Sequence, residues 1–182
     1  STWLVAEVRL DGKLHRQRYE RGKPVTPVEV VGEADDTGTT ISFMPDGEIF
    51  DTLEFSAEIL SQRLRELAFL SKVAITLKDE RDDKEMTFKY DGGIVSFVQH
   101  LNKNKDLIHD DIIYFDKAVD DVEVEFALQY NDGYIDNTFT YANYINTHDG
   151  GTHLSGFRSA LTRTLNDYAR KNNIIKENEQ NL

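Results

Sequence analysis

The chain has 182 residues, with 33 acidic and 21 basic side chains, a formal net charge of −12, ten Phe, eight Tyr and no cysteine. The absence of thiols excludes disulfides, cysteine nucleophiles and thiolate metal sites, while the many aromatic residues argue against low-complexity disorder. No signal-peptide core and no apolar run near the roughly 18 residues of a membrane helix is visible, so we expect a cytoplasmic protein, and its acidity requires any nucleic-acid contact to use a local basic face.

The first half of the chain is predicted to consist mainly of β-hairpins. Alternating apolar residues over 3–19, turned at Asp11-Gly12, predict the first hairpin. Ser56 can cap a helix whose apolar residues recur every three or four positions through Ala68. The remaining expected elements are short strands at 28–31 and 39–43 and a second hairpin formed by 73–77 and 85–90.

The second half of the chain mixes helices and strands. After Gly92-Gly93 we expect a helix over 94–101, and the polar stretch 102–106 is the best candidate for a domain boundary. A long helix should follow Gly150-Gly151. The expected strands are 112–115, 122–130 and 134–144, the last two joined by a turn at 131–133. This pattern predicts an α+β chain in two pieces.

Charge is unevenly distributed along the second half. Between Asp106 and Asp149 there are eleven acidic residues and one lysine, whereas 158–176 holds five basic residues against one aspartate. A second basic cluster lies at 13–23. The simplest interpretation of both basic clusters is a solvated surface, and a phosphate-binding face is the alternative.

The sequence lacks the common nucleotide-binding and metal-binding motifs. It contains no P-loop, no dinucleotide fingerprint and no zinc-type histidine pair on a helix. His148 and His153 flank a glycine turn and could bind a metal or act as a base, but solvated or capping roles are more common. The acidic run 79–83 lacks the ligand order of a calcium loop, which favours a solvated hairpin tip.

A possible ligand-binding segment is the sequence Thr37-Gly38-Thr39-Thr40-Ile41. Gly38 permits close approach to a flat ligand, and the hydroxyl of Thr39 can donate and accept a hydrogen bond. Taken alone, the same residues also fit an ordinary turn into a strand.

Longer stretches resemble the ATPase region of the B subunits of type II topoisomerases, with DNA gyrase preferred over topoisomerase IV. The stretch GGTHLSGFRSALTR is highly specific, and the resemblance covers nearly the whole chain in colinear order. The matching segments are 11–25, 35–50, 58–70, 90–93, 100–105, 122–134 and 145–172.

The resemblance implies two structural parts. Residues 1–104 resemble the C-terminal half of the GHKL-type (Bergerat) ATPase fold with a connecting helix. Residues 105–182 resemble the first part of the transducer, a ribosomal-protein-S5-like α+β domain that relays nucleotide state to the DNA gate. The implied boundary coincides with the polar stretch described above.

The resemblance also implies a nucleotide-contacting strand. Gly38, Thr39 and Ile41 match the segment that lines the adenine pocket, with the hydroxyl of Thr39 on the base and its ordered water and Ile41 as an apolar wall. The family usually has an arginine at the rim where aminocoumarins stack, and Leu10 occupies that position here. Because neighbouring strand residues point to opposite faces, Arg9 should not replace this arginine unless the hairpin register slips.

No catalytic residue is expected within this chain. In the family, the catalytic glutamate and the magnesium-binding asparagine precede the segment that begins here at Ser1, and the phosphate-contacting lysine follows Leu182. The chain is therefore expected to be an internal fragment that is inactive alone. ATP and Mg²⁺ are implied as cofactors only for the intact protein.

For the intact protein, the resemblance implies ATP-dependent self-dimerisation, a heterotetramer of two gyrase A and two gyrase B polypeptides, and double-stranded DNA as partner, with no membrane. Arg158 and Arg163 are candidates for a DNA-facing cavity, and surface pairing with acidic segments is the alternative. Because these two positions lie about 140° apart on a helix, they and Arg170 are not expected to share one groove. Topoisomerase IV and a non-catalytic relay module remain alternative functions.

Overall fold

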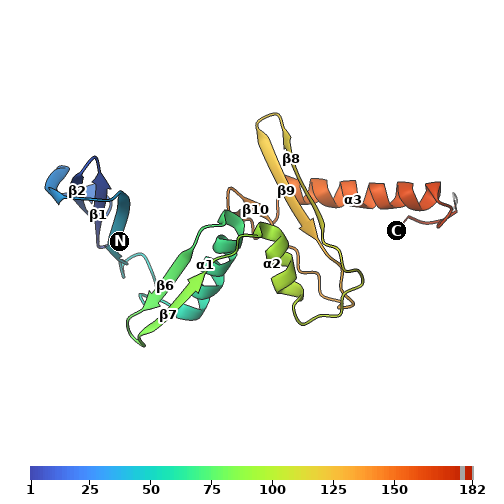
Figure 1. The fold of residues 1–182 in the computed structure, drawn as a ribbon, viewed down its shortest axis with the longest axis horizontal. Helices are drawn as coiled ribbons and strands as arrows, with labels where there is room; N and C mark the ends of the chain where they lie inside the picture. The colour runs from blue at the N-terminus through green and yellow to red at the C-terminus, as the bar shows by residue number, and fades with distance from the viewer. Residues whose placement is uncertain (177–178, 182) are drawn as a thin grey trace. The chain divides into compact units, whose positions relative to one another are not determined.

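The computed structural model describes residues 1–176 and 179–181 of the chain (Figure 1). Its contacts divide it into two compact parts, which we call the N-terminal unit, Ser1–Ser56, and the C-terminal unit, Ala57–Leu182. The N-terminal unit is all β, whereas every helix of the described residues lies in the C-terminal unit. The boundary that the sequence predicts near residue 104 stays a prediction.

The N-terminal unit is an antiparallel sheet of five strands. Its strand order is β3-β2-β1-β5, and β4 also pairs with β2. Asp11 and Gly12 both have positive φ, 51° and 74°, as the two-residue turn of a type I′ hairpin requires. The strands are β1 (Trp3–Leu10), β2 (Lys13–Glu20), β3 (Lys23–Pro24), β4 (Glu29–Glu33) and β5 (Gly38–Met44).

The first part of the C-terminal unit packs two helices and a hairpin around aromatic residues. Helix α1 contacts both strands of the hairpin and α2. The core centres on Phe69, which is 1% exposed and stacks on Tyr90 with ring centroids 3.6 Å apart. The elements are α1 (Ala57–Ser71), β6 (Ile75–Asp79), β7 (Lys84–Phe88) and α2 (Gly93–Asn102).

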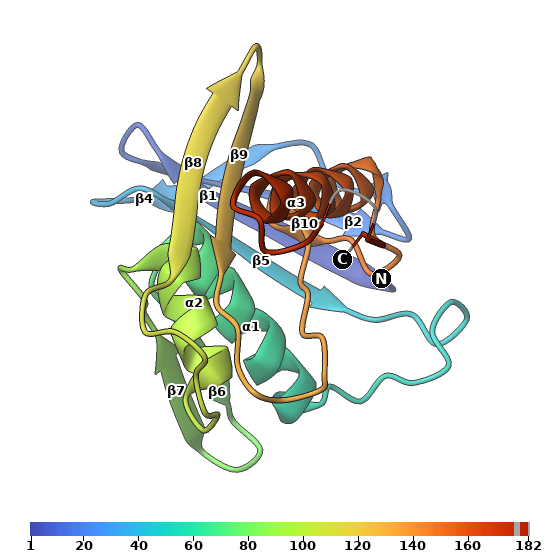
Figure 2. The same cartoon turned by 90° about the vertical axis from the view of Figure 1, so that its right-hand side faces the viewer.

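The second part of the C-terminal unit consists of the long β8–β9 hairpin, a short hairpin and one long helix (Figure 2). Phe126 on β9 packs against Phe157 on α3, with centroids 4.5 Å apart. The elements are β8 (Ile113–Val119), β9 (Val122–Leu128), β10 (Tyr141–Ala142), β11 (Ile145–Asn146) and α3 (Thr152–Lys171).

The predicted strand at 134–144 is wrong: only the two residues of β10 within it are in a strand. The reason is that Asn131, predicted as part of a hairpin turn, is engaged elsewhere. Its backbone bridges to Leu107 and its side chain donates to Asn102 at 2.9 Å. Tyr134 consequently projects into solvent, fully exposed, instead of pairing beside β9.

A polar network ties the end of α2 to the end of β9. The amide of Asn102, 9% exposed, donates to Gln129 at 3.0 Å. Gln129 in turn donates to the carbonyl oxygens of His109 and Asp110. Because these groups satisfy one another, the polar stretch that follows α2 is held by hydrogen bonds across the predicted boundary. In the described residues, no helix is both long and apolar enough to cross a lipid bilayer.

Candidate functional site

Strand β5 presents Thr39 and Ile41 on one face of the N-terminal sheet. In the register with β1, Thr39 lies opposite Val8 and Ile41 opposite Ala6. Cross-strand partners share a face, so a polar hydroxyl and an apolar side chain lie side by side on a strip lined by small and branched residues. Thr39 is exposed and Ile41 is 50% exposed. Within the described residues, β5 pairs with β1 alone.

Gly38 makes room for Arg9 on the opposite face. Arg9 donates through Nε to Asp36 at 2.8 Å and through Nη1 to the hydroxyl of Thr40 at 3.3 Å. A β-carbon added at Gly38 would lie 2.6 Å from Nη2 of Arg9. The glycine thus lets a guanidinium cross the start of β5, a role that sequence analysis missed because it depends on the sheet neighbour.

Leu10 lies on the face that carries Thr39. The β1–β2 register is regular to its end, with Leu10 paired to Lys13 and Arg9 paired to Leu14. Alternation therefore places Leu10 and Val8 on the same face, whereas Arg9 points to the other face and forms an ion pair with Asp36 there. Leu10 is 50% exposed, so an apolar side chain stands at the rim of the strip.

The strip combines features that suit a flat ligand. A hydroxyl beside an apolar surface suits the polar edge and the faces of a heteroaromatic ring. The described residues bring together no group of three His, Asp or Glu side chains that could hold a metal ion.

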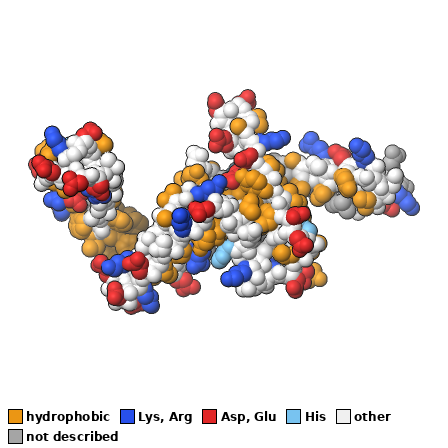
Figure 3. All heavy atoms as spheres, viewed as in Figure 1, with side chains coloured by type: hydrophobic (Ala, Val, Ile, Leu, Met, Phe, Trp, Pro, Cys, Tyr) orange, Lys and Arg blue, Asp and Glu red, His pale blue; other side chains and the backbone are white. Residues whose placement is uncertain are grey.

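A second candidate site is a shallow hollow along α3. It is lined by three arginines together with hydroxyl and amide side chains (Figure 3 shows blue side chains along this helix). All three arginines line this hollow, although helical geometry was not expected to let them share one groove. The arginines are Arg158, Arg163 and Arg170, and the neighbours are Ser159, Thr162, Asn166, Asp167 and Asn181.

The arginines of the hollow differ in their contacts. Arg158 pairs with Asp136 at 3.2 Å, and both side chains are more than half exposed. Such a pair contributes little and is easily exchanged for another anion. Arg170 donates to the carbonyl of Lys176 at 2.8 Å and to Asn181 at 2.7 Å, which folds the segment after α3 back onto the helix. Arg158 is the more readily available of these two cations.

The histidines flanking the glycine turn lie at the start of α3. His153 contacts the hydroxyl of Thr147 through Nε2 at 3.1 Å, and His148 is exposed. Neither belongs to a metal-binding group among the described residues. The contact with Thr147 links the short β10–β11 hairpin to the helix.

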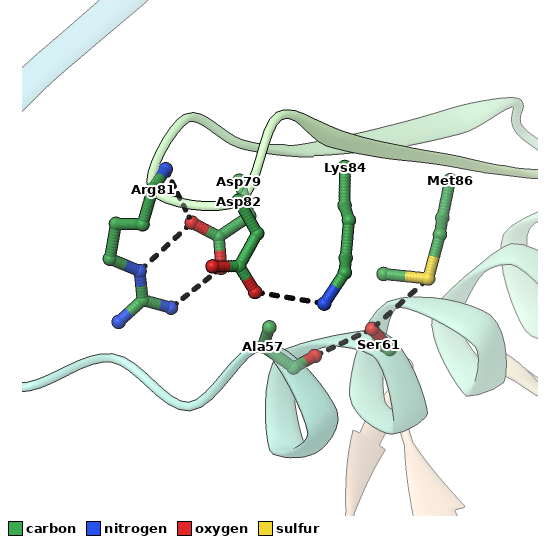
Figure 4. Close-up of polar contacts among 7 residues, drawn as sticks. All are labelled: Ala57, Ser61, Asp79, Arg81, Asp82, Lys84 and Met86. Atoms are coloured by element: carbon green, nitrogen blue, oxygen red, sulfur yellow. Dashed lines mark hydrogen bonds and ion pairs between the residues drawn. The ribbon is translucent and has the colours of Figure 1, made fainter.

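The acidic run at 79–83 forms the tip of the β6–β7 hairpin (Figure 4). Arg81 donates to both carboxylate oxygens of Asp79, at 2.8 and 2.6 Å, and Lys84 pairs with Asp82 at 2.8 Å. The side-chain and backbone hydrogen bonds from Arg81 lower the pKa of Asp79 to about 2, from 3.8. Cations inside the hairpin thus balance two of its carboxylates.

The depressed pKa of Asp79 predicts an acid-sensitive hairpin tip. Stabilisation from the ionised carboxylate should be complete above the unfolded pKa of 3.8 and should disappear as the pH falls through about 2. The carboxyl carbon shift of Asp79, followed by NMR, should therefore titrate near pH 2. An Arg81→Met variant should return the midpoint toward 3.8, and a midpoint near 3.8 in the unmodified chain would contradict the bonded geometry.

The sequence of this chain is similar to DNA gyrase B proteins. A family model described as DNA gyrase B matches residues 93–182. The DNA gyrase B protein of Clostridium acetobutylicum is 52% identical over 178 residues, covering 97% of this chain and 28% of that protein. The corresponding protein of Streptococcus pneumoniae is 50% identical over 186 residues, covering 100% of this chain and 29% of that protein. The chain thus spans less than a third of the length of either relative.

Two solved structures share the fold over nearly the whole chain. The 43K ATPase domain of Thermus thermophilus gyrase B, in complex with an aminocoumarin, matches with a TM-score of 0.77 and 41% identity. The match covers 98% of this chain and 50% of that structure. The B-subunit of the DNA gyrase from Myxococcus xanthus matches with a TM-score of 0.78 and 27% identity, over 93% of this chain and 50% of that one.

Proposed function

Because the chain belongs to the DNA gyrase B family, we propose that it serves in an ATP-dependent type II topoisomerase that passes one DNA duplex through a transient double-strand break. The relatives reported above are gyrase proteins, which favours a change of supercoiling over the decatenation of topoisomerase IV. The α+β fold is that of the gyrase B ATPase region, the C-terminal part of a GHKL-type domain followed by the start of a transducer. We place the boundary between the two near residue 104.

The contribution of the N-terminal unit is one wall of the nucleotide site. The observation that supports this role is the exposed hydroxyl of Thr39 beside Ile41 on β5. Thr39 would hydrogen-bond the adenine base, Ile41 would contact its face, and Gly38 would let the backbone at the start of β5 approach the base closely. ATP with Mg²⁺ is the cofactor of the intact protein, and we expect the general base and metal ligands from residues outside this chain.

The contribution of α3 is a contact with DNA phosphates. Arg158 and Arg163 line a hollow with hydroxyl and amide neighbours, and guanidinium groups bind phosphate oxygens in a planar, bidentate way. Arg158 can exchange its exposed pair with Asp136 for a phosphate at little cost. The intact protein would act in the cytoplasm, dimerise when ATP binds, and assemble with two copies of the gyrase A protein.

The function is tested in a hybrid protein, in which this chain replaces the matching 178 residues of the Clostridium acetobutylicum relative. Supplied with relaxed plasmid, ATP and the gyrase A protein, the hybrid should introduce supercoils, and without ATP it should not. The 182-residue chain alone should release no phosphate from ATP. A folded hybrid without supercoiling activity would contradict the proposal, as would turnover by the isolated chain.

Leu10 predicts weak aminocoumarin binding. The Thermus thermophilus structure was solved with an aminocoumarin, and Leu10 gives the rim of the corresponding face no hydrogen-bond donor. A Leu10→Arg hybrid should bind an aminocoumarin roughly 10-fold more tightly, the gain of one charge-assisted hydrogen bond. Calorimetric titration measures this affinity, and Lys23→Arg, a change that keeps the charge on the opposite face of the sheet, is the control. Equal affinity of the parent hybrid and the Leu10→Arg variant would place the inhibitor away from this rim.

A further inference from the structure

The short β10–β11 hairpin is fastened to α1, nearly 80 residues earlier in the chain. Arg63 on α1 donates through Nη2 to the carbonyl oxygen of Tyr144 at 2.9 Å. The hydroxyl of Tyr141 donates to Oε2 of Glu66 at 3.5 Å, and Arg63 also pairs with this oxygen at 3.2 Å. The side chain of Glu66 is only 13% exposed, whereas that of Arg63 is 40% exposed, so the carboxylate is shielded from water on the side of the hairpin.

Tyr141 is a dependable donor in this cluster. Burial, followed by the charge of Glu66, raises the pKa of Tyr141 to about 12. The hydroxyl therefore stays protonated across the physiological range. Glu66 accepts hydrogen bonds from Gln62 and Arg63 on its own helix and from Tyr141 of the hairpin, so it joins the two elements directly.

Arg63 binds the hairpin at its most strained point. The two turn residues, Asn143 and Tyr144, have φ of 48° and 67°, as a two-residue type I′ turn requires. Asparagine tolerates this conformation, but a bulky residue such as tyrosine adopts it at a cost. The hydrogen bond from Arg63 to the carbonyl of Tyr144 helps to hold the turn in place.

The hairpin continues directly into the first turn of α3. Thr147 donates its amide to the carbonyl of Thr140 at 2.8 Å, and their hydroxyls lie 2.6 Å apart. The hydroxyl of Thr147 contacts Nε2 of His153, the second residue of α3, at 3.1 Å. Gly150 donates to the carbonyl of Thr147 at 2.8 Å. An unbroken series of contacts thus runs from α1 through the hairpin to the start of α3.

We propose that Arg63 and Glu66 are positioning residues that, through the β10–β11 hairpin, fix the N-terminal end of α3 and so couple nucleotide state to the arginines facing DNA. The inference rests on the proposed function, in which α1 belongs to the ATPase part and α3 faces DNA. A displacement of α1 is passed to α3 because packed elements move as bodies. Coupling is reciprocal, so DNA on α3 acts on the nucleotide site by the same route.

The first test compares ATP hydrolysis by the hybrid protein with and without DNA. In Arg63→Ala, DNA stimulation should fall roughly 3- to 10-fold, the range of coupling changes along such a contact series. The kcat and KM without DNA should stay within about twofold of the parent. Lys84→Ala is the control. It also removes a cation, but the ion-pair partner of Lys84 is Asp82 in the same β6–β7 hairpin, so the contacts between α1 and the β10–β11 hairpin are kept. Unchanged stimulation in Arg63→Ala overturns the inference while the proposed function stands.

A second test requires no catalytic activity. In the 182-residue chain, hydrogen exchange of the Ser155 amide, which bonds to the carbonyl of Gly151, reports opening of the first turn of α3. Arg63→Ala and Tyr141→Phe should each accelerate this exchange roughly 3- to 10-fold, and Lys84→Ala should not. Unaltered exchange overturns the mechanical link. Accelerated exchange with no DNA stimulation in the parent hybrid overturns the proposed function of α3 and supports the link.

Discussion

Replacing Phe69 with alanine should lower the free energy of unfolding of the C-terminal unit by about 3–5 kcal/mol. Phe69 is 1% exposed and is the largest side chain fully buried among the described residues. Its ring stacks on Tyr90 and contacts Phe97 and His100, with centroids 5.2 and 5.6 Å away. Deletion removes the contacts with three rings in two segments, Tyr90 and helix α2, and the core cannot close the resulting cavity without moving α1 or α2.

Two spectroscopic signals separate this loss from unfolding elsewhere. The single tryptophan, Trp3, lies in the N-terminal unit, whereas all described helices lie in the C-terminal unit. In a urea titration, the helical circular dichroism of Phe69→Ala should therefore be lost at lower urea, while the Trp3 fluorescence transition stays in place. Tyr134→Ala, at a fully exposed aromatic residue, should change stability by less than about 0.5 kcal/mol. Equal effects of the two variants would show that Phe69 is not a core residue.

Replacing Thr39 with valine should weaken ATP binding by the hybrid protein roughly 10- to 100-fold, because the substitution keeps the branched shape and removes the hydroxyl that we propose to hydrogen-bond the base. A binding site that hydrogen-bonds its ligand loses about 1–3 kcal/mol when the partner is left unpaired. The measurement is the dissociation constant of a non-hydrolysable ATP analogue, determined by calorimetry.

The neighbouring threonine provides a matched control for this experiment. Thr40 lies on the opposite face, paired with Glu7 in the register, and accepts a hydrogen bond from Arg9. Thr40→Val makes the same chemical change one residue along the same strand, so it should leave nucleotide affinity within about twofold. If both variants lose affinity equally, the effect is a distortion of β5 and Thr39 does not contact the base.

Local patterns were sufficient to predict most elements of the fold. The turn at Asp11-Gly12 determines the register of β1 and β2, and the spacing of apolar residues after Gly151 predicts α3. Alternation along β1 also places Leu10 and Arg9 on opposite faces. These features depend on residues close in sequence, whose steric and hydrophobic preferences act before any tertiary contact forms.

Features that depend on distant contacts could not be predicted in this way. The strand expected at 134–144 fails because Asn131 is held by Leu107 and Asn102. The association of Glu66 with Tyr141 has no local signal, since a glutamate on a helix usually faces solvent. The shared hollow of the arginines on α3 likewise depends on how far long side chains reach, which helical angles alone do not describe.

The strand that carries Thr39 also determines how the separate chain behaves in solution. Among the described residues β5 has a neighbour on one side only, and its sequence from Gly38 to Met44 holds neither lysine nor proline. Ile41 and Phe43 on this strand are each 50% exposed. Natural sheets use lysine and proline on their edge strands to discourage edge-to-edge association, and β5 has neither residue. We therefore expect copies of the isolated chain to associate through β5 at high concentration and to separate into monomers on dilution.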